Sequence, residues 1–202
     1  MEEISKVYVQ TDEQGKIIRC EGGLTTPSNL DGWTLIDQGT GDKYLLCQSH
    51  YFEGGLYTQD GYPRYKLKDG AVELRTEAEL EADLLPDRKQ QKITESKQEL
   101  EQYLMSHPLQ WTDGSFYSIT EEKQNQLMGT LVAAQLDGKK PEWNTTGGVC
   151  KEWELEELTA LAISIKNKVK ELVKYQQTKE LEIQQAETIL ELEQIVVDYS
   201  QI

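Results

Sequence analysis

Cys47 and His50 are the two residues whose types and spacing come closest to a reactive site. A Cys-x-x-His spacing can chelate a metal ion, but a zinc site needs four ligands, or three and a water molecule. The other histidine, His107, and the other cysteines, Cys20 and Cys150, have no paired spacing. The pattern favours a cysteine at a strand end beside a surface histidine, so we expect no metal ion and no cofactor.

Nucleophilic catalysis would require His50 or His107 to act as a base towards a serine or a cysteine. The chain has no Gly-x-Ser-x-Gly elbow. Its carboxylates are so numerous that a catalytic pair cannot be told from a solvated helix face. Its glycine-rich stretches do not open a helix after a strand, as phosphate loops do. We therefore predict a protein that is not an enzyme, without catalytic residues.

The formal net charge is −15, from 36 acidic and 21 basic residues in a chain of 202. This charge repels phosphate backbones and anionic lipid headgroups, so we expect neither nucleic-acid binding nor membrane insertion. No apolar run approaches the roughly 18 residues needed to span a bilayer. Three widely spaced cysteines favour reduced thiols, and the opening residues do not resemble a signal peptide. Synthesis in the cytosol is the expectation.

Short β-type segments separated by glycine-containing turns predict a small antiparallel β module over residues 1–75. The clearest hairpin is Tyr62–Leu74, where Asp69 and Gly70 have the composition of a type I′ turn. The other predicted strands are Lys6–Gln10, Lys16–Cys20, Trp33–Ile36 and Tyr44–Cys47.

Six of the ten tyrosines lie in this module. Tyr57 and Tyr62 are candidates for surface recognition of a protein or a sugar, because aromatic side chains are enriched at such surfaces. The alternative is that a small β module needs these aromatic rings for its own core. The same argument favours a core position for Trp33, Trp111 and Trp143.

Residues 76–108 are predicted to form two linker helices. Thr76 and Glu79 have the spacing of a capping box, which indicates a helix start. Pro86 is expected to end or restart the helix, and Pro108 to stop the second one.

Residues 109–175 are predicted to form a hairpin and helix domain in which one pattern occurs twice. A hairpin with Asp113 and Gly114 at its turn precedes a helix over Thr120–Leu136, with Thr120 as the N-cap. A second hairpin, Pro141–Trp153, precedes a long helix. Trp111 and Trp143 hold equivalent places before the two turns. The expected fold class is α+β: an N-terminal antiparallel β module, followed by a helix–hairpin–helix–hairpin–long helix region.

From residue 152 to residue 200 the chain has no proline or glycine, and its apolar residues recur at heptad spacing, which predicts one long helix with coiled-coil character. The pattern lapses at Gln176 and Lys179, which can mark a bend, a change of partner or a register device. We expect residues 176–202, a helical extension, to reach another chain; the alternative is a helix folded into its own bundle. The predicted partner-binding seam comprises Leu158, Ile165, Val169, Leu172, Ile183, Ala186, Ile189, Leu190 and Val197.

The layout resembles a family of small tail-associated proteins encoded by prophages and bacteriophages of Gram-positive bacteria. In the first half the resemblance lies in VYVQTDEQGKI, GWTLIDQGTGDKY, YFEGGLYTQDG and YPRYKLKDGAVELRTEAELEAD. In the second half it lies in LQWTDGSFYSIT and EWNTTGGVCKEWELEELTALAISI, which are similar to a domain encoded beside, or fused to, tail-fibre and baseplate genes.

This resemblance implies a non-enzymatic tail protein, made in the bacterial cytoplasm and incorporated into a virion or a phage-tail-like particle. It implies a structural component of the tail fibre or baseplate, with other tail proteins and further copies of the chain as partners. One alternative is a tail-fibre assembly chaperone that the particle does not retain. Another is a receptor- or glycan-binding module that uses the N-terminal aromatic residues.

Overall fold

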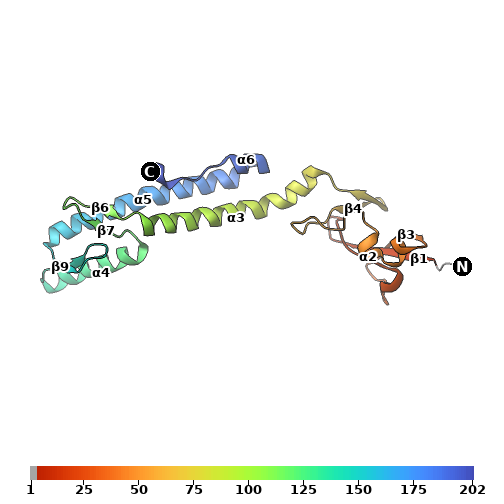
Figure 1. Cartoon of the computed structure of the whole chain (residues 1–202), viewed down its shortest axis with the longest axis horizontal. Coiled ribbons are helices and arrows are strands. Elements are labelled where there is room, and N and C mark those ends of the chain that lie inside the picture. Colours follow the sequence, from red (N-terminus) through yellow and green to blue (C-terminus); the bar gives the residue numbers. More distant parts are fainter. Residues whose placement is uncertain (1–3) are drawn as a thin grey trace. The chain divides into compact units, whose positions relative to one another are not determined.

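The computed structural model describes residues 4–202, which divide into two compact units, one up to Asp87 and one from Arg88 to Ile202. Small antiparallel sheets and long helices make the fold α+β, as predicted (Figure 1). The sequence predicted four segments, with boundaries after residues 75, 108 and 175. The boundary between the two compact units falls within helix α3 (Glu77–Ser106), which contributes residues to both units.

The first unit is built on a three-stranded antiparallel sheet in the order β2-β1-β3. Its strands are β1 (Ser5–Thr11), β2 (Ile17–Gly22) and β3 (Thr34–Gly39). The middle of β1 is buried on both faces, because Val7, Tyr8 and Val9 are all buried, and Val7 and Val9 share one face of the sheet. That face forms the core of the unit, which consists of Val7, Val9, Ile17, Cys20, Cys47 and Phe52.

The predicted strand Tyr44–Cys47 is wrong. The 3₁₀ turn η1 (Gly23–Thr25) follows β2, and two short helices, α1 (Asp42–Leu45) and α2 (Cys47–His50), follow β3. A short apolar run does not distinguish a strand from a buried helical turn. The helical turns bring the hydroxyls of Tyr44 and Tyr51 to the same carboxylate oxygen of Asp37, at 3.3 and 3.0 Å.

The predicted type I′ hairpin is confirmed. Strands β4 (Tyr65–Lys68) and β5 (Ala71–Leu74) pair antiparallel, with Lys68 opposite Ala71. Between them Asp69 and Gly70 both have positive φ, 52° and 81°, as this turn type requires.

Helix α3 begins at the predicted capping box, but it does not end at Pro86. The Thr76 hydroxyl accepts from the Glu79 N–H, and the Glu79 carboxylate accepts from the Thr76 N–H. Pro86 lies inside the helix. It removes one backbone hydrogen bond at a position where its side chain is exposed, so water can satisfy the freed carbonyl and the helix continues.

The second unit contains the twice-occurring pattern of hairpin and helix. Strands β6 (Leu109–Gln110) and β7 (Phe116–Tyr117) precede α4 (Glu121–Asp137), and strands β8 (Glu142–Asn144) and β9 (Cys150–Glu152) precede α5 (Leu155–Gln185). Thr120 is the N-cap of α4, as predicted; its hydroxyl accepts from the N–H of Lys123. Tyr117, Trp143 and Trp153 from the hairpins pack with α4 and α5 in one core.

Helices α3 and α5 lie side by side and antiparallel within this unit (Figure 1). The ammonium group of Lys89 donates to the carbonyl of Gln184 at 2.8 Å, and Lys97 pairs with Glu180 at 3.1 Å.

The predicted continuous helix from residue 152 to residue 200 is wrong, because α5 ends at Gln185. Ala186 leaves the helical region, and the Thr188 hydroxyl accepts from the N–H of Glu191 to cap a new short helix, α6 (Ile189–Gln194). The chain then returns along α5 to the 3₁₀ turn η2 (Tyr199–Gln201). The chain reverses its direction after α5 although it has no glycine or proline there, and Thr188 caps the helix that follows.

Candidate functional site

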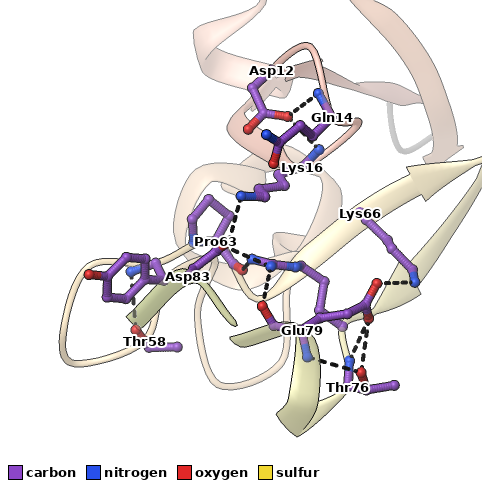
Figure 2. A network of polar contacts seen from close by, with 11 residues as sticks. Asp12, Gln14, Lys16, Thr58, Pro63, Lys66, Thr76, Glu79 and Asp83 are labelled. Atoms are coloured by element: carbon purple, nitrogen blue, oxygen red, sulfur yellow. Dashed lines mark hydrogen bonds and ion pairs between the residues drawn. The ribbon is translucent and has the colours of Figure 1, made fainter. Parts of the chain in front are cut away.

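Figure 2 shows a network of polar contacts in the first unit that includes Lys16, Glu79 and Asp83. The network centres on Arg75, whose side chain is almost fully buried. Its guanidinium donates to the carbonyls of Pro63 and Glu79 at 2.8 and 2.7 Å, and it pairs with the Asp83 carboxylate at 2.8 Å. A buried guanidinium is stable only when such acceptors surround it. Arg75 therefore joins the start of α3 to the segment before β4.

Asp83 receives a second cation from the opposite side. The Lys16 ammonium group lies 2.8 Å from the other oxygen of the carboxylate. Partial burial alone would raise the pKa of Asp83, but hydrogen bonds from Lys16 and Arg75 outweigh it and lower the pKa below its usual value. Asp83 is thus held ionised, and it connects the turn between β1 and β2 to α3.

Lys66 on β4 makes the third connection, to Glu79 at 2.7 Å. This hydrogen bond, together with that from the Thr76 N–H, lowers the pKa of Glu79 to about 2. The first turns of α3 are therefore fixed to the β4–β5 hairpin by charge-assisted hydrogen bonds.

An open groove of about 540 Å³ lies beside this network, and both predicted recognition residues, Tyr57 and Tyr62, line it. The Tyr57 hydroxyl donates to the carbonyl of Ile18, and the Tyr62 hydroxyl donates to the Asp87 carboxylate. Both rings are therefore held in place by their hydroxyls. The other lining residues are Asp12, Gln14, Lys16, Ile18, Gly61, Pro63, Ala82, Asp83 and Pro86.

This groove combines aromatic rings with carboxylate and amide groups. Such a surface suits a ligand with both apolar faces and hydroxyl groups, such as a sugar, because the rings cover its C–H faces while the polar groups bind its hydroxyls. Its carboxylate Asp83 already has two cationic partners.

The predicted partner-binding seam is mostly enclosed within its own unit, so the prediction of an open seam is wrong. Leu158, Ile165 and Leu172 belong to the core of the second unit, and Val169 and Val197 pack against that core. Ile183 and Ala186 are buried, and Ile189 is half-buried; only Leu190 among the nine is exposed. The chain covers the seam with α3, α4 and its own returning C-terminal segment.

The lapse at Gln176 marks a buried polar contact between helices. Gln176 is buried against α3, where its amide donates to the Ser96 hydroxyl at 3.4 Å and to Glu180 on its own helix at 3.1 Å. Ser96 is also buried, and its carbonyl accepts from the Tyr199 hydroxyl at 2.7 Å. This hydrogen bond can form in only one alignment of α3 and α5, which agrees with a register device, one of the alternatives that the sequence left open.

Cys47 lies in the core of the first unit, whereas His50 is exposed and contacts the neighbouring Ser49 hydroxyl at 2.8 Å. The Cys20 thiol donates to the Cys47 carbonyl, and burial raises the pKa of both thiols. Within residues 4–202 no group of three or more His, Cys, Asp or Glu side chains is arranged to hold a metal ion. Over the same residues no helix is long and apolar enough to cross a membrane.

Sequence reasoning did not single out Lys16, Arg75 or Asp83. The one available signal was local, since Arg75 directly precedes the capping-box residue Thr76. The partners of Arg75 come from Pro63, Glu79 and Asp83, and no periodic pattern connects these positions. Comparison of the chain with family models, with curated proteins and with solved structures gives no match.

Proposed function

We propose that this chain is a non-enzymatic structural component of the tail of a bacteriophage or phage-tail-like particle, part of its fibre or baseplate. The observation that supports the proposal is that the two sets of stretches that resemble tail-associated proteins divide between the two units of the fold. The stretches quoted from the first half lie entirely in the unit that ends at Asp87, and those from the second half lie in the unit from Arg88 onwards. Each set includes core residues of its own unit.

In this proposal the contacts with other tail proteins lie outside the predicted partner-binding seam. Five of its nine residues are buried in the chain's own interior, so another chain could reach them only if the second unit unfolded. Exposed residues must therefore make these contacts.

The test is a measurement of this protein in purified particles. Quantitative mass spectrometry on particles from an induced lysogen should find it at a fixed, symmetric ratio to the tail proteins. A chaperone would instead bind fibre protein in the lysate and be absent from the particle. Absence from both the particle and any complex with a tail protein would refute the proposal.

Recognition of a receptor glycan is a second candidate function, favoured by the groove that Tyr57 and Tyr62 line. On a glycan array the intact chain should bind, and the double variant Tyr57→Ala, Tyr62→Ala should lose at least 10-fold in affinity. Tyr57→Phe with Tyr62→Phe keeps both rings but removes the hydroxyls that hold them, so its affinity should lie between those of the intact chain and the alanine variant. Absence of binding by the intact chain, or equal binding by the alanine variant, would exclude this function.

A further inference from the structure

Helix α4 presents an uncharged face to solvent. Leu127, Leu131 and Ala134 are buried against the core of the second unit. The opposite face has its own heptad spacing, with Asn125, Gly129, Val132 and Leu136 in the seam and Met128 and Ala133 beside it, all of them exposed. Leu136 is 83% exposed, and no charged residue occurs between Lys123 and Asp137. In a chain with a net charge of −15, this neutral and partly apolar face is a candidate interface.

Gly129 lies at the centre of this face, and packing within residues 4–202 does not require a glycine there. Glycine is the worst helix former after proline. A Cβ added at Gly129 would meet nothing within 4 Å, so no neighbour in the described chain requires its absence. A glycine on an outward helix face allows another backbone to approach closely.

The charges at the ends of α4 identify the partner as a second copy of the same helix. Its first turn carries Glu121 and Glu122, and Lys139 and Lys140 follow its last turn. If two copies pair antiparallel about the midpoint between residues 130 and 131, the first-turn glutamates of one copy lie at the end of the interface where Lys139 and Lys140 follow α4 in the other copy. A parallel pair would bring glutamates against glutamates and lysines against lysines.

The side-chain sizes follow the same symmetry. In the antiparallel pair Val132 lies opposite Gly129, and Met128 lies opposite Ala133. A large residue meets a small one at each of these positions, so the two backbones can pack closely without overlap. The face is therefore complementary to itself, which a two-fold symmetric interface requires.

Both lysines already contact carboxylates of their own chain, Lys139 that of Asp137 at 3.7 Å and Lys140 that of Glu154. These pairs are exposed and therefore contribute little to stability. An ammonium group has three donors, so each lysine can also bind a glutamate of a second copy.

We propose that the uncharged face of α4 is the interface of a homodimer in which two α4 helices pack antiparallel. The proposal uses only residues of α4 and its flanks and does not depend on a role in a phage tail. The partner-binding seam predicted from the sequence takes no part in it.

The first experiment measures the mass of the full-length chain by sedimentation equilibrium at 0.15 M salt, where repulsion between the acidic surfaces is screened beyond about 8 Å. The wild-type chain should be a dimer at micromolar concentration. Leu136→Glu should raise the dissociation constant at least 100-fold. Leu181→Glu, at an exposed leucine of α5, is the matched control and should leave it unchanged. A monomeric wild type, or a dimer whose dissociation constant does not change with Leu136→Glu, would overturn the proposal.

Charge reversal tests the antiparallel orientation. The variant Glu121→Lys, Glu122→Lys and the variant Lys139→Glu, Lys140→Glu should each have a higher dissociation constant than wild type, because like charges then meet at both ends of the interface. An equimolar mixture should form a heterodimer, since every facing pair is opposite again. Two variants that each dimerise as well as wild type, or a mixture that stays monomeric, would rule out this geometry.

The variant Gly129→Ala tests whether the glycine serves the close approach of two α4 helices or only the fold of a single chain. Alanine is the better helix former, so the thermal unfolding midpoint of the dilute monomer should rise. The dissociation constant of the dimer should rise at least 10-fold, because two added methyl groups separate the backbones. Unchanged dimerisation by this variant would contradict the close approach.

Discussion

The two units of this chain are stabilised by different means. The first has a core of six buried residues and depends on a polar network around Arg75. The second buries a larger apolar core between α3, α4 and α5, together with the two hairpins, and its buried polar contacts include those of Ser96 with Gln176 and Tyr199. A small β module with little apolar area requires directional contacts to hold its parts together, whereas paired helices gain enough from apolar burial.

The largest effect is expected from a charge in the apolar core of the second unit. Leu172 is fully buried, so Leu172→Asp should destabilise that unit by about 4 kcal/mol. Lys174→Asp, on the exposed side of the same helix, introduces the same carboxylate and should cost less than about 0.5 kcal/mol. Urea unfolding followed by circular dichroism at the helix band measures both. Similar midpoints would mean that apolar burial does not dominate this unit.

Removal of the central cation should destabilise the first unit selectively. Arg75→Met deletes three polar contacts and leaves Asp83 with one cation, so we expect a loss of about 2–3 kcal/mol. Hydrogen exchange followed by mass spectrometry should show faster exchange in peptides of β4 and β5 and unchanged exchange in α5. Arg19→Met, at an exposed arginine paired with Glu21, is the control and should have little effect. Uniformly faster exchange in both units would contradict the distinction between them.

The hydrogen bond from the Tyr199 hydroxyl to the Ser96 carbonyl helps to hold the returning C-terminal segment, and its loss should have a moderate effect. Tyr199→Phe keeps the ring between Tyr103 and Tyr175 but removes the hydroxyl that donates to the Ser96 carbonyl. The expected cost is about 1 kcal/mol, with increased exchange in α6. Protection of α6 equal to that in wild type would show that apolar packing alone holds this segment.

The smallest effect concerns pH. The pKa of Glu79 is lowered to about 2 from an unfolded value of 4.5, so the ionised carboxylate stabilises the folded first unit above pH 4.5, and this stabilisation is lost as the pH falls towards 2. Asp83, whose pKa is also lowered, acts in the same direction. Thermal unfolding of Glu79→Gln should show a weaker dependence on pH between 4.5 and 2 than wild type. An identical dependence would mean that Glu79 does not contribute.

The turns and hairpins could be predicted from the sequence because local residues determine them. Asp69–Gly70, Asp113–Gly114 and the cap at Thr120 each act within a few residues. The end of α5 also had a local signal, since Thr188 and Glu191 have the spacing of a capping box, but the heptad pattern on either side hid it.

The candidate site was only partly accessible to sequence reasoning. Tyr57 and Tyr62 could be proposed from residue type alone, and the structure places both in one groove. Lys16 and Asp83 are 67 positions apart, and no periodicity connects them. Long-range pairs of this kind become visible only when the fold brings the two residues together.

The bond between Tyr199 and Ser96 joins residues 103 positions apart and has a consequence for biosynthesis. During translation α3 leaves the ribosome long before Tyr199 does. The contact between Ser96 and Tyr199 therefore cannot form until almost the whole second unit has emerged. The hairpins can form as they appear, but this closure cannot. A nascent chain stalled after α5 would therefore expose to proteases and chaperones apolar surface that the finished protein conceals.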